Sequence, residues 1–393
     1  MTQPDFDRII ERRGTHSAKW DMMERSYGVS AEDGLAMWVA DMDFRAPDCV
    51  SAALRRMADH GVYGYYGDEA GYRRAICWWM RERHGWEVAP EWIFSTHGLV
   101  NGTALCVQTW SAPGDAVLLF TPVYHAFARV IRAAGRQVTE APLALRDGRY
   151  EMDFEVAAAA LTGREKMVIL CSPHNPGGRV WSVDELRALA DFCAAHDLLL
   201  VSDEIHHDLV YPGHSHRVMA DAVPEASGRL VMMTAPSKTF NIAGSHTGNV
   251  IIPDDRLRAD FAATLAGLGL SPNSFGLHMT EAAYSPEGAE WVEALIAYLD
   301  GNRRLFDAGL GAIPGVRPMA LESTYLAWVD FSGTGMTPEE VAARVEKGAR
   351  IAANHGASFG SGGDSFMRFN LGMARARIEA AVARLQEAFA DLQ

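Results

Sequence analysis

Short apolar runs that alternate with helical segments are the feature of this sequence that most limits its fold. Several of the runs are apolar throughout, as in strands that are buried on both faces of a sheet. Helix-like segments separate them, which predicts an α/β fold with a mostly parallel sheet flanked by helices. The expected strands are Trp92–Thr96, Ala116–Phe120, Met167–Cys171, Leu198–Ser202, Leu230–Thr234 and Gly248–Ile252.

The pattern changes near residue 285, and this change predicts a smaller second domain of the α+β class. Apolar residues from Trp291 to Leu310 recur at helical spacing and indicate one long helix that crosses between the domains. Strands are expected after it at Tyr325–Phe331 and Phe366–Leu371. Other helices are expected at Pro47–His60, Gly71–His84, Pro338–Ala349 and Ala374–Leu392. We expect an N-terminal arm that packs with the small domain (1–45), a large domain (46–285) and the small C-terminal domain (286–393).

The composition favours a small molecule as the partner of this chain. The 393 residues are 48% hydrophobic, enough for a large core, and the formal net charge is −14. Nucleic acids and anionic membranes attract clustered Lys and Arg, so neither is an expected partner. The five cysteines are widely spaced without a Cys-x-x-Cys pair, and the N-terminus lacks the apolar run of a signal peptide. We therefore expect a cytoplasmic protein without a disulfide framework, a thiolate metal site or a membrane span.

Polar groups follow the expected strands at their carboxyl ends, where ligands gather in open α/β sheets. After the first strand, the segment from His97 to Gly102 leads into an apolar helix whose free amides suit a phosphate. Lys238 follows the fifth strand in a loop-like segment, where its amine can form a Schiff base with a carbonyl cofactor. The remaining strand ends supply an aromatic ring, an amide and a carboxylate, from Tyr124, Asn175 and Asp203.

Together these groups match the requirements of pyridoxal 5′-phosphate (PLP). Each has a simpler explanation alone, since Tyr124 suits a core, Asn175 a turn and Asp203 a helix cap. The carboxylate is the most informative member of the set. Beside the pyridine nitrogen it keeps that nitrogen protonated, and only a protonated ring withdraws electrons strongly. Lys238 would attach the cofactor covalently.

The chain resembles the fold type I PLP enzymes of the aspartate aminotransferase superfamily, and within them the MalY/PatB-type cystathionine β-lyases, or C–S lyases. The resemblance covers nearly the whole length and implies a mostly parallel sheet of the seven-stranded type in the large domain. Its motifs are Lys19-Trp-Asp21, Met37-Trp-Val-Ala-Asp-Met-Asp-Phe44, His60-Gly-Val-Tyr-Gly64, Cys171-Ser-Pro-His-Asn-Pro-Gly-Gly-Arg-Val180, Val201-Ser-Asp-Glu-Ile-His206 and Pro236-Ser-Lys-Thr-Phe-Asn-Ile-Ala-Gly244.

The resemblance also implies roles for individual residues. Lys238, Asp203 and Tyr124 would be catalytic, with Asp203 at the ring nitrogen and Tyr124 stacked on the ring. Arg368 would bind the substrate carboxylate with its fork of donors, together with Asn175 and Tyr124. The implied cofactor-binding residues are Lys238, Gly98, Leu99, Val100, Tyr124, Asn175, Asp203, His206, Ser237 and, from the other subunit of a homodimer with shared active sites, Tyr63.

Two residues depart from the wider superfamily. His206 stands three residues after Asp203, where many aminotransferases have tyrosine, and it matches the lyase subfamily. His246 stands where a phosphate-binding arginine is usual, so Tyr63 and the helix amides are expected to matter more. The implied reaction is α,β-elimination of L-cystathionine or a related cysteine S-conjugate to a thiol, pyruvate and ammonia. Aminotransfer by the same residues is the alternative.

Two other classes of function are weaker readings of the sequence. The stretch from Asp203 to His216 is crowded with acidic residues and histidines, as in a metal hydrolase. However, adjacent His206 and His207 tend to point apart, and no helical His-x-x-x-His pair exists, so no metal is expected. A regulatory role through a protein partner is also known in the lyase subfamily, but no surface for it is recognisable in the sequence.

Overall fold

The chain folds around a seven-stranded sheet. The structure is a computed structural model that describes residues 4–392, so the first three residues of the expected arm lie outside the described part. The strands lie in the order β2-β10-β9-β8-β7-β3-β4. Their bounds are β2 (Ile93–Thr96), β3 (Ala116–Thr121), β4 (Gln137–Pro142), β7 (Glu165–Cys171), β8 (Leu199–Asp203), β9 (Leu230–Thr234) and β10 (Gly248–Ile251).

Strand direction brings the ends of distant segments to one edge of this sheet. Only β10 runs antiparallel to its neighbours, β2 and β9, and all the other pairs are parallel. The carboxyl ends of β2, β3, β7, β8 and β9 therefore share an edge with the amino end of β10. The expected α/β fold with a mostly parallel seven-stranded sheet is confirmed.

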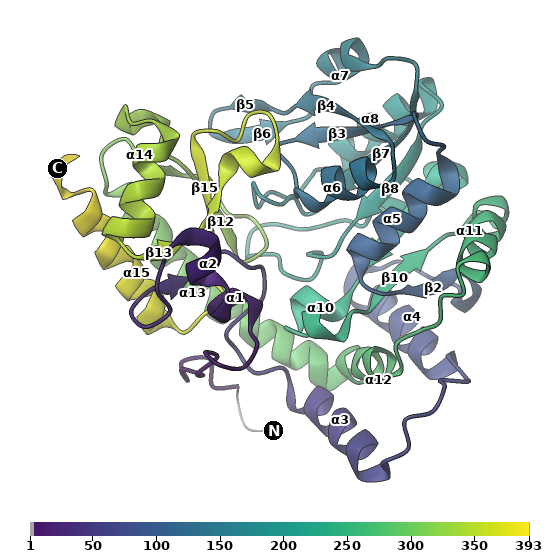
Figure 1. Ribbon diagram of the computed structural model, residues 1–393. Helices are drawn as coiled ribbons and strands as arrows, with labels where there is room; N and C mark the ends of the chain where they lie inside the picture. The colour runs from purple at the N-terminus through teal and green to yellow at the C-terminus, as the bar shows by residue number, and fades with distance from the viewer. Residues whose placement is uncertain (1–3, 393) are drawn as a thin grey trace.

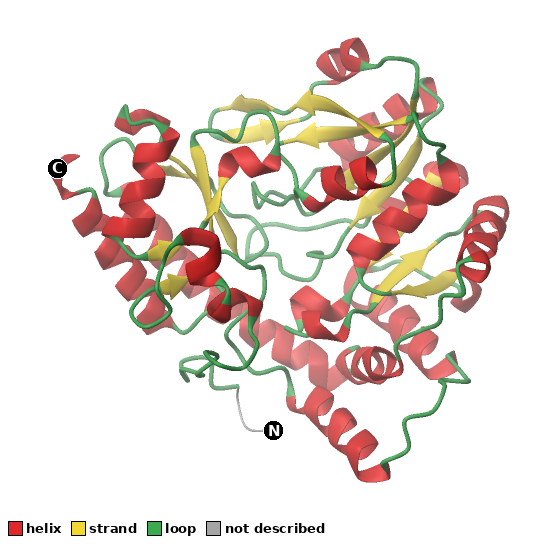
Figure 2. Ribbon diagram, in the orientation of Figure 1, coloured by secondary structure: helices red, strands yellow, loops and turns green. Residues whose placement is uncertain are grey.

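Both faces of the sheet are covered, as the apolar runs predict. Along β3, Val117 and Leu119 belong to one buried cluster, while Leu118 and Phe120 belong to another on the opposite face. Figure 2 shows helices on both sides of the strands. The first face packs against α5 (Leu99–Trp110), α6 (Ala126–Ala133) and α11 (Asp255–Gly267). The second packs against α4 (Ala70–His84), α8 (Val183–Ala195), α12 (Ser274–Ala283) and α13 (Pro286–Gly311).

The six strands expected for this sheet lie within two residues of the observed ones, and β4 is the strand of the sheet that the sequence analysis missed. This strand forms an edge of the sheet and pairs only with β3. Its two end residues, Gln137 and Pro142, are exposed, and Glu140 is half-buried. The segment is therefore too polar to be recognised as a strand that is buried on both faces.

A second, antiparallel sheet lies beside the large one in the C-terminal third of the chain. Its strand order is β11-β12-β15-β14. The expected long helix is present as α13, and the expected strands are present as β12 and β15. The bounds are β11 (Arg317–Pro318), β12 (Leu326–Asp330), β14 (Asn354–His355), β15 (Phe366–Asn370), α14 (Pro338–Ala343), η5 (Arg344–Gly348) and α15 (Arg375–Ala388). The proposed domain boundaries stay a prediction.

The N-terminal segment crosses towards this smaller sheet. Strand β1 (Leu35–Ala36) pairs in parallel with β13 (Ile351–Ala352), and Figure 1 shows α1 and α2 beside the C-terminal elements. Asn370 Nδ2 donates to the backbone oxygens of Val39 and Asp41 at 2.5 and 2.6 Å. These bonds hold residues 39–41 in a defined position.

The remaining elements are short connections or outer helices. They are α1 (Ala18–Asp21), α2 (Met23–Tyr27), α3 (Asp48–His60), α7 (Phe154–Ala160), α9 (Met219–Ala222), α10 (Pro236–Thr239), β5 (Ala144–Arg146), β6 (Arg149–Glu151), η1 (Pro90–Trp92), η2 (Pro224–Arg229), η3 (Ala243–Ser245), η4 (Ser332–Thr334), η6 (Gly356–Phe359) and η7 (Ala390–Leu392). None of the helices within residues 4–392 combines the length and the apolarity that crossing a bilayer requires.

Candidate functional site

Lys238 lies at the carboxyl edge of the large sheet, in the single helical turn α10 that follows β9. Its Nζ donates a hydrogen bond of 2.6 Å to the backbone oxygen of Ala40, which also accepts a bond of 2.9 Å from Tyr325 Oη. Burial lowers the pKa of Lys238 to about 8, against the opposing effect of the Asp41 charge. Part of the amine is therefore neutral near neutral pH, and a neutral amine is a nucleophile.

Asp203 is a buried carboxylate at the end of the neighbouring strand, β8. It is 4% exposed, and its Oδ1 accepts a hydrogen bond of 3.1 Å from the backbone N–H of Ile205. Burial raises the pKa of Asp203 to about 7, and the charge of Lys238 opposes this shift. Asp203 and Lys238 are thus close enough for each charge to change the pKa of the other. A buried acid in this position suits a cationic partner.

The start of α5 provides a set of free backbone donors at the same edge. Gly98 is the N-cap residue, has φ +84°, and no side chain accepts from the first turn as a cap. The amides of Leu99 and Val100 therefore point out of the helix without intrahelical partners. The added Cβ of a residue at Gly248 would lie 2.6 Å from Leu99 Cδ2, so β10 packs directly against this turn. Such a turn attracts an anion through its amides and helix dipole.

Arg368, on β15 of the smaller sheet, is a buried guanidinium that pairs with no carboxylate among the described residues. One terminal nitrogen donates to Asn175 Oδ1 at 2.9 Å. The other donates to Asn354 Oδ1 at 2.5 Å and to the backbone oxygen of Trp38 at 2.9 Å. Its Nε has no partner, and burial lowers the pKa of Arg368 to about 10. A buried cation surrounded by neutral acceptors is a site for an anionic ligand.

Tyr124 and His206 add an aromatic ring and an imidazole to this region. The Tyr124 ring lies edge-to-face against His125 and Phe127, with centroids 5.0 and 5.6 Å apart. Burial raises the pKa of Tyr124, and the Arg368 charge opposes this. His206 is 1% exposed and its Nδ1 has no partner. Burial lowers the pKa of His206 well below its usual range, with Lys238 and Arg368 adding to the effect.

The other expected cofactor residues lie in different surroundings. Ser237, next to Lys238, is 9% exposed. Tyr63 is 61% exposed on the segment between α3 and α4, where its ring lies 5.7 Å from that of Phe275. His246 is exposed with φ +45° just before β10. The role expected for Tyr63 therefore depends on a second copy of the chain.

The described residues fit PLP chemically. The uncapped turn of α5 suits its phosphate, the Lys238 amine suits its carbonyl carbon, and the buried Asp203 suits its ring nitrogen. Two buried polar atoms near these groups have no partner in the described part of the chain. They are Arg368 Nε and His206 Nδ1. Unpartnered buried atoms carry a free-energy cost that a bound polar molecule can remove.

Sequence reasoning missed two side chains of this site, Tyr325 and Asn354. Tyr325 donates a hydrogen bond to the same Ala40 backbone oxygen as Lys238. Asn354 Oδ1 accepts a hydrogen bond from the Arg368 guanidinium. Asn354 in turn donates to Tyr27 Oη at 2.9 Å. Both residues reach the site from the smaller sheet, more than a hundred residues away from Asp203 and Asn175 in sequence. No local motif marks them.

Comparison with known proteins gives a consistent result. The pattern of the family described as aminotransferase class I and II matches residues 35–385. Cystathionine β-lyase PatB of Bacillus subtilis is 40% identical over 98% of this chain and 99% of its own length. Cystalysin of Treponema denticola, whose crystal structure contains a pyridoxal 5′-phosphate cofactor, is 34% identical with a TM-score of 0.94, over 99% of this chain and all of its own.

A third similar protein is the PLP-bound C–S lyase from Staphylococcus hominis. Its structure is 30% identical to this chain, with a TM-score of 0.90 over 98% of both chains. Overall fold and sequence therefore agree with this group of structures along almost the full length.

The pKa of Asp203 predicts how the stability of the cofactor-free protein depends on pH. The unfolded carboxyl loses its proton near pH 4, whereas the folded one keeps it until about pH 7. The folded state therefore binds more protons between these values, and this residue makes stability fall as the pH rises from 4 to 7. We expect Asp203→Asn to lose less stability over this window than the wild type, measured by urea unfolding. Asp184→Asn, a fully exposed control, should keep the wild-type dependence; equal slopes for Asp203→Asn and wild type would contradict the assignment.

Proposed function

Because the chain belongs to the aminotransferase class I and II family, we propose that it is a PLP-dependent C–S β-lyase. Its substrate would be L-cystathionine or a related cysteine S-conjugate, which α,β-elimination converts to a thiol, pyruvate and ammonia. The names of the similar lyases support this choice. The observation that carries it is the buried Arg368 guanidinium, which has no acidic partner within residues 4–392 and shares a site with Lys238 and Asp203.

PLP, when bound, supplies a carbonyl carbon for the substrate amine and a ring that withdraws electrons from the substrate Cα. The Asp203 carboxylate would hold a proton on the ring nitrogen. Asn175 Oδ1 accepts a hydrogen bond from Arg368. The Nδ2 of Asn175 would therefore be free to donate to the phenolic oxygen of PLP. Ser237 and the amides of Gly98, Leu99 and Val100 would bind the phosphate. Tyr124 would pack against the ring, with His206 nearby.

Arg368 and Lys238 would act on the substrate itself. The guanidinium binds the α-carboxylate and so fixes the orientation of the Cα–H bond relative to the ring. Lys238, with a pKa of about 8, takes up the Cα proton at Nζ. The electron pair of that bond forms the Cα–Cβ double bond as sulfur leaves Cβ as a thiolate. Hydrolysis of the released enamine gives pyruvate and ammonia.

We also propose a homodimer in the cytoplasm. The segment between α3 and α4 exposes three large side chains. Val62 is 69% exposed, Tyr63 is 61% exposed and Tyr65 is fully exposed. An aromatic surface of this kind is typical of an interface, and from it the partner's Tyr63 would reach the cofactor phosphate. All five cysteines are free, as expected in a reducing compartment.

Turnover without an acceptor distinguishes elimination from aminotransfer. We expect the purified protein with PLP to convert L-cystathionine to equal amounts of pyruvate and homocysteine in the absence of any keto acid. Pyruvate would be followed with lactate dehydrogenase and thiol with a chromogenic disulfide. No turnover until 2-oxoglutarate is supplied would contradict the lyase and favour the aminotransferase alternative, which uses the same residues.

Arg368→Ala tests the carboxylate site. Loss of a buried two-pronged contact to a carboxylate costs about 3–4 kcal/mol, so kcat/KM should fall by roughly 10²–10³-fold. The absorption spectrum of bound PLP should change little, because Arg368 is assigned to the substrate. Arg187→Ala, at a half-exposed arginine on α8, is the matched control and should keep wild-type kinetics. A wild-type KM for Arg368→Ala would exclude the assigned role.

A further inference from the structure

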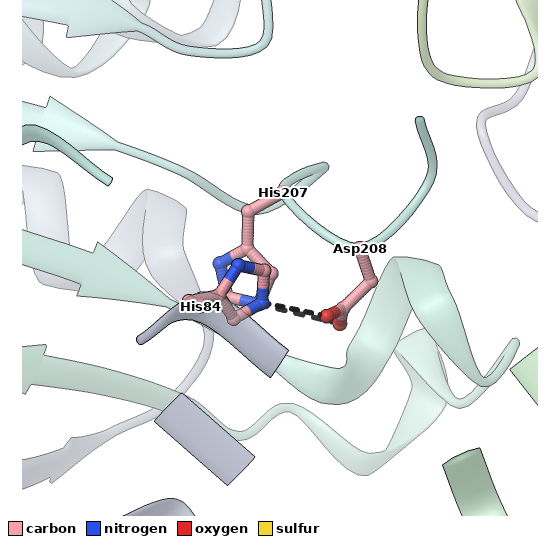
Figure 3. Close-up of side chains that lie close together, drawn as sticks. All are labelled: His84, His207 and Asp208. Atoms are coloured by element: carbon pink, nitrogen blue, oxygen red, sulfur yellow. Dashed lines mark hydrogen bonds and ion pairs between the residues drawn. The ribbon is translucent and has the colours of Figure 1, made fainter. Parts of the chain in front are cut away.

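A second group of buried polar side chains lies next to α10, the turn that carries Lys238. His84 is the last residue of α4, while His207 and Asp208 lie in the loop that follows β8. The three side chains point toward one another in Figure 3. One ligand atom from each residue lies within 4.8 Å of the other two. The cluster brings together two segments that are more than a hundred residues apart in sequence.

The carboxylate of Asp208 is the centre of this cluster. His84 Nε2 lies 2.9 Å from Oδ1, and His207 Nε2 lies 3.2 Å from Oδ2. Trp79 Nε1 donates to Oδ1 at 2.9 Å and Thr239 Oγ1 to Oδ2 at 2.7 Å. These last two bonds fix the carboxylate from outside the cluster, as second-shell donors do for a carboxylate that binds a metal.

His207 is the member that the protein alone leaves unsatisfied. It is 2% exposed, and neither Nδ1 nor Nε2 has a hydrogen-bond partner in the described part of the chain. Although Nε2 lies near Asp208 Oδ2, the pair does not have hydrogen-bond geometry. An unpartnered buried polar atom destabilises the folded state. A ligand between His207 and Asp208 would remove part of that destabilisation.

We propose that His84, His207 and Asp208 bind one Zn²⁺ ion. In a tetrahedral zinc site with metal–ligand distances of about 2.0–2.2 Å, neighbouring ligand atoms lie roughly 3.3–3.6 Å apart. His84 Nε2 lies 2.9 Å from one oxygen of Asp208 and His207 Nε2 lies 3.2 Å from the other, while one ligand atom from each of the three residues lies within 4.8 Å of the other two. Rotation of the carboxylate would turn one oxygen toward both histidines, and a water molecule would be the fourth ligand. For His84, the ring proton now shared with Asp208 would move to Nδ1, so the imidazole stays neutral.

The ligand types select the class of metal. Two imidazoles with one carboxylate suit zinc and the neighbouring first-row transition metals, whereas Mg²⁺ and Ca²⁺ require mainly oxygen ligands. The charge of the site limits its affinity for zinc. Asp208 supplies a single negative charge against the two positive charges of the ion, and the positively charged Arg83 lies close by, with Nε 3.8 Å from Asp208 Oδ1. The Arg83 charge is partly offset by Glu293, whose Oε1 lies 2.8 Å from Arg83 Nη2. We therefore expect weaker binding than at a site built from cysteines.

The position of the ion gives it a structural role that is separate from the proposed reaction. It would join the end of α4 to the loop that follows Asp203. Through Asp208 and Thr239 it would also fix α10, the turn that carries Lys238. Zinc in this place would stabilise the folded chain against heat whether or not the protein cleaves C–S bonds.

Metal content of the PLP-loaded protein tests the proposal. The protein would be produced in zinc-supplemented medium, purified without chelators or a histidine tag, and measured by mass spectrometry for zinc. We expect about one zinc per chain in the wild type and less than about one tenth of that in His84→Asn and His207→Asn. His214→Asn, at an exposed histidine of the same stretch, should retain the wild-type content and is the matched control.

Three results would overturn the proposal. They are a wild-type protein that remains without zinc after growth and after refolding with Zn²⁺, zinc that persists in His207→Asn, and zinc that is lost in His214→Asn. If the cluster variants fail to fold, X-ray absorption of the wild type decides. Two imidazoles and two oxygens at about 2.0–2.2 Å support the site, and a shell with fewer than two imidazoles excludes it.

Discussion

Burial of unlike charges at one edge of a sheet is the constraint around which this protein is organised. Lys238, Asp203 and Arg368 each have a pKa shifted by burial, and within residues 4–392 none of them forms a salt bridge. A fold retains such groups when a ligand completes their interactions. The Lys238 amine suits the carbonyl carbon of PLP, and the Asp203 acid suits its ring nitrogen. The Arg368 guanidinium suits the carboxylate of an amino acid.

The order of the strands explains how these groups meet. The lysine and the acid follow adjacent parallel strands, β9 and β8, so their separation is determined by the sheet. Arg368 comes from the other sheet, where β15 lies against the segment at Trp38 and Ala40. That segment also accepts the Lys238 hydrogen bond. The N-terminal residues thereby connect the two halves of the site, so a shift between the two sheets would change both halves together.

The sequence alone was sufficient for the features that depend on local pattern. Apolar runs predicted six of the seven large-sheet strands, and the polar residues that end them, such as Asp203 and Lys238, could be recognised as one set. Features that depend on distant contacts could not be read in this way. Asn354 and Tyr325 reach the site only through the packing of the smaller sheet, and His84 meets His207 only because α4 ends beside the loop that follows β8. The polar edge strand β4 lacked the expected apolar run.

Covalent attachment at Lys238 is the most direct test of the central claim. The protein, saturated with PLP, would be reduced with borohydride, digested and analysed by peptide mass spectrometry. The account predicts a pyridoxyl phosphate group on the peptide that contains Lys238, together with loss of the visible absorption band. An unmodified Lys238, or modification at the exposed Lys166 or Lys347 instead, would contradict it.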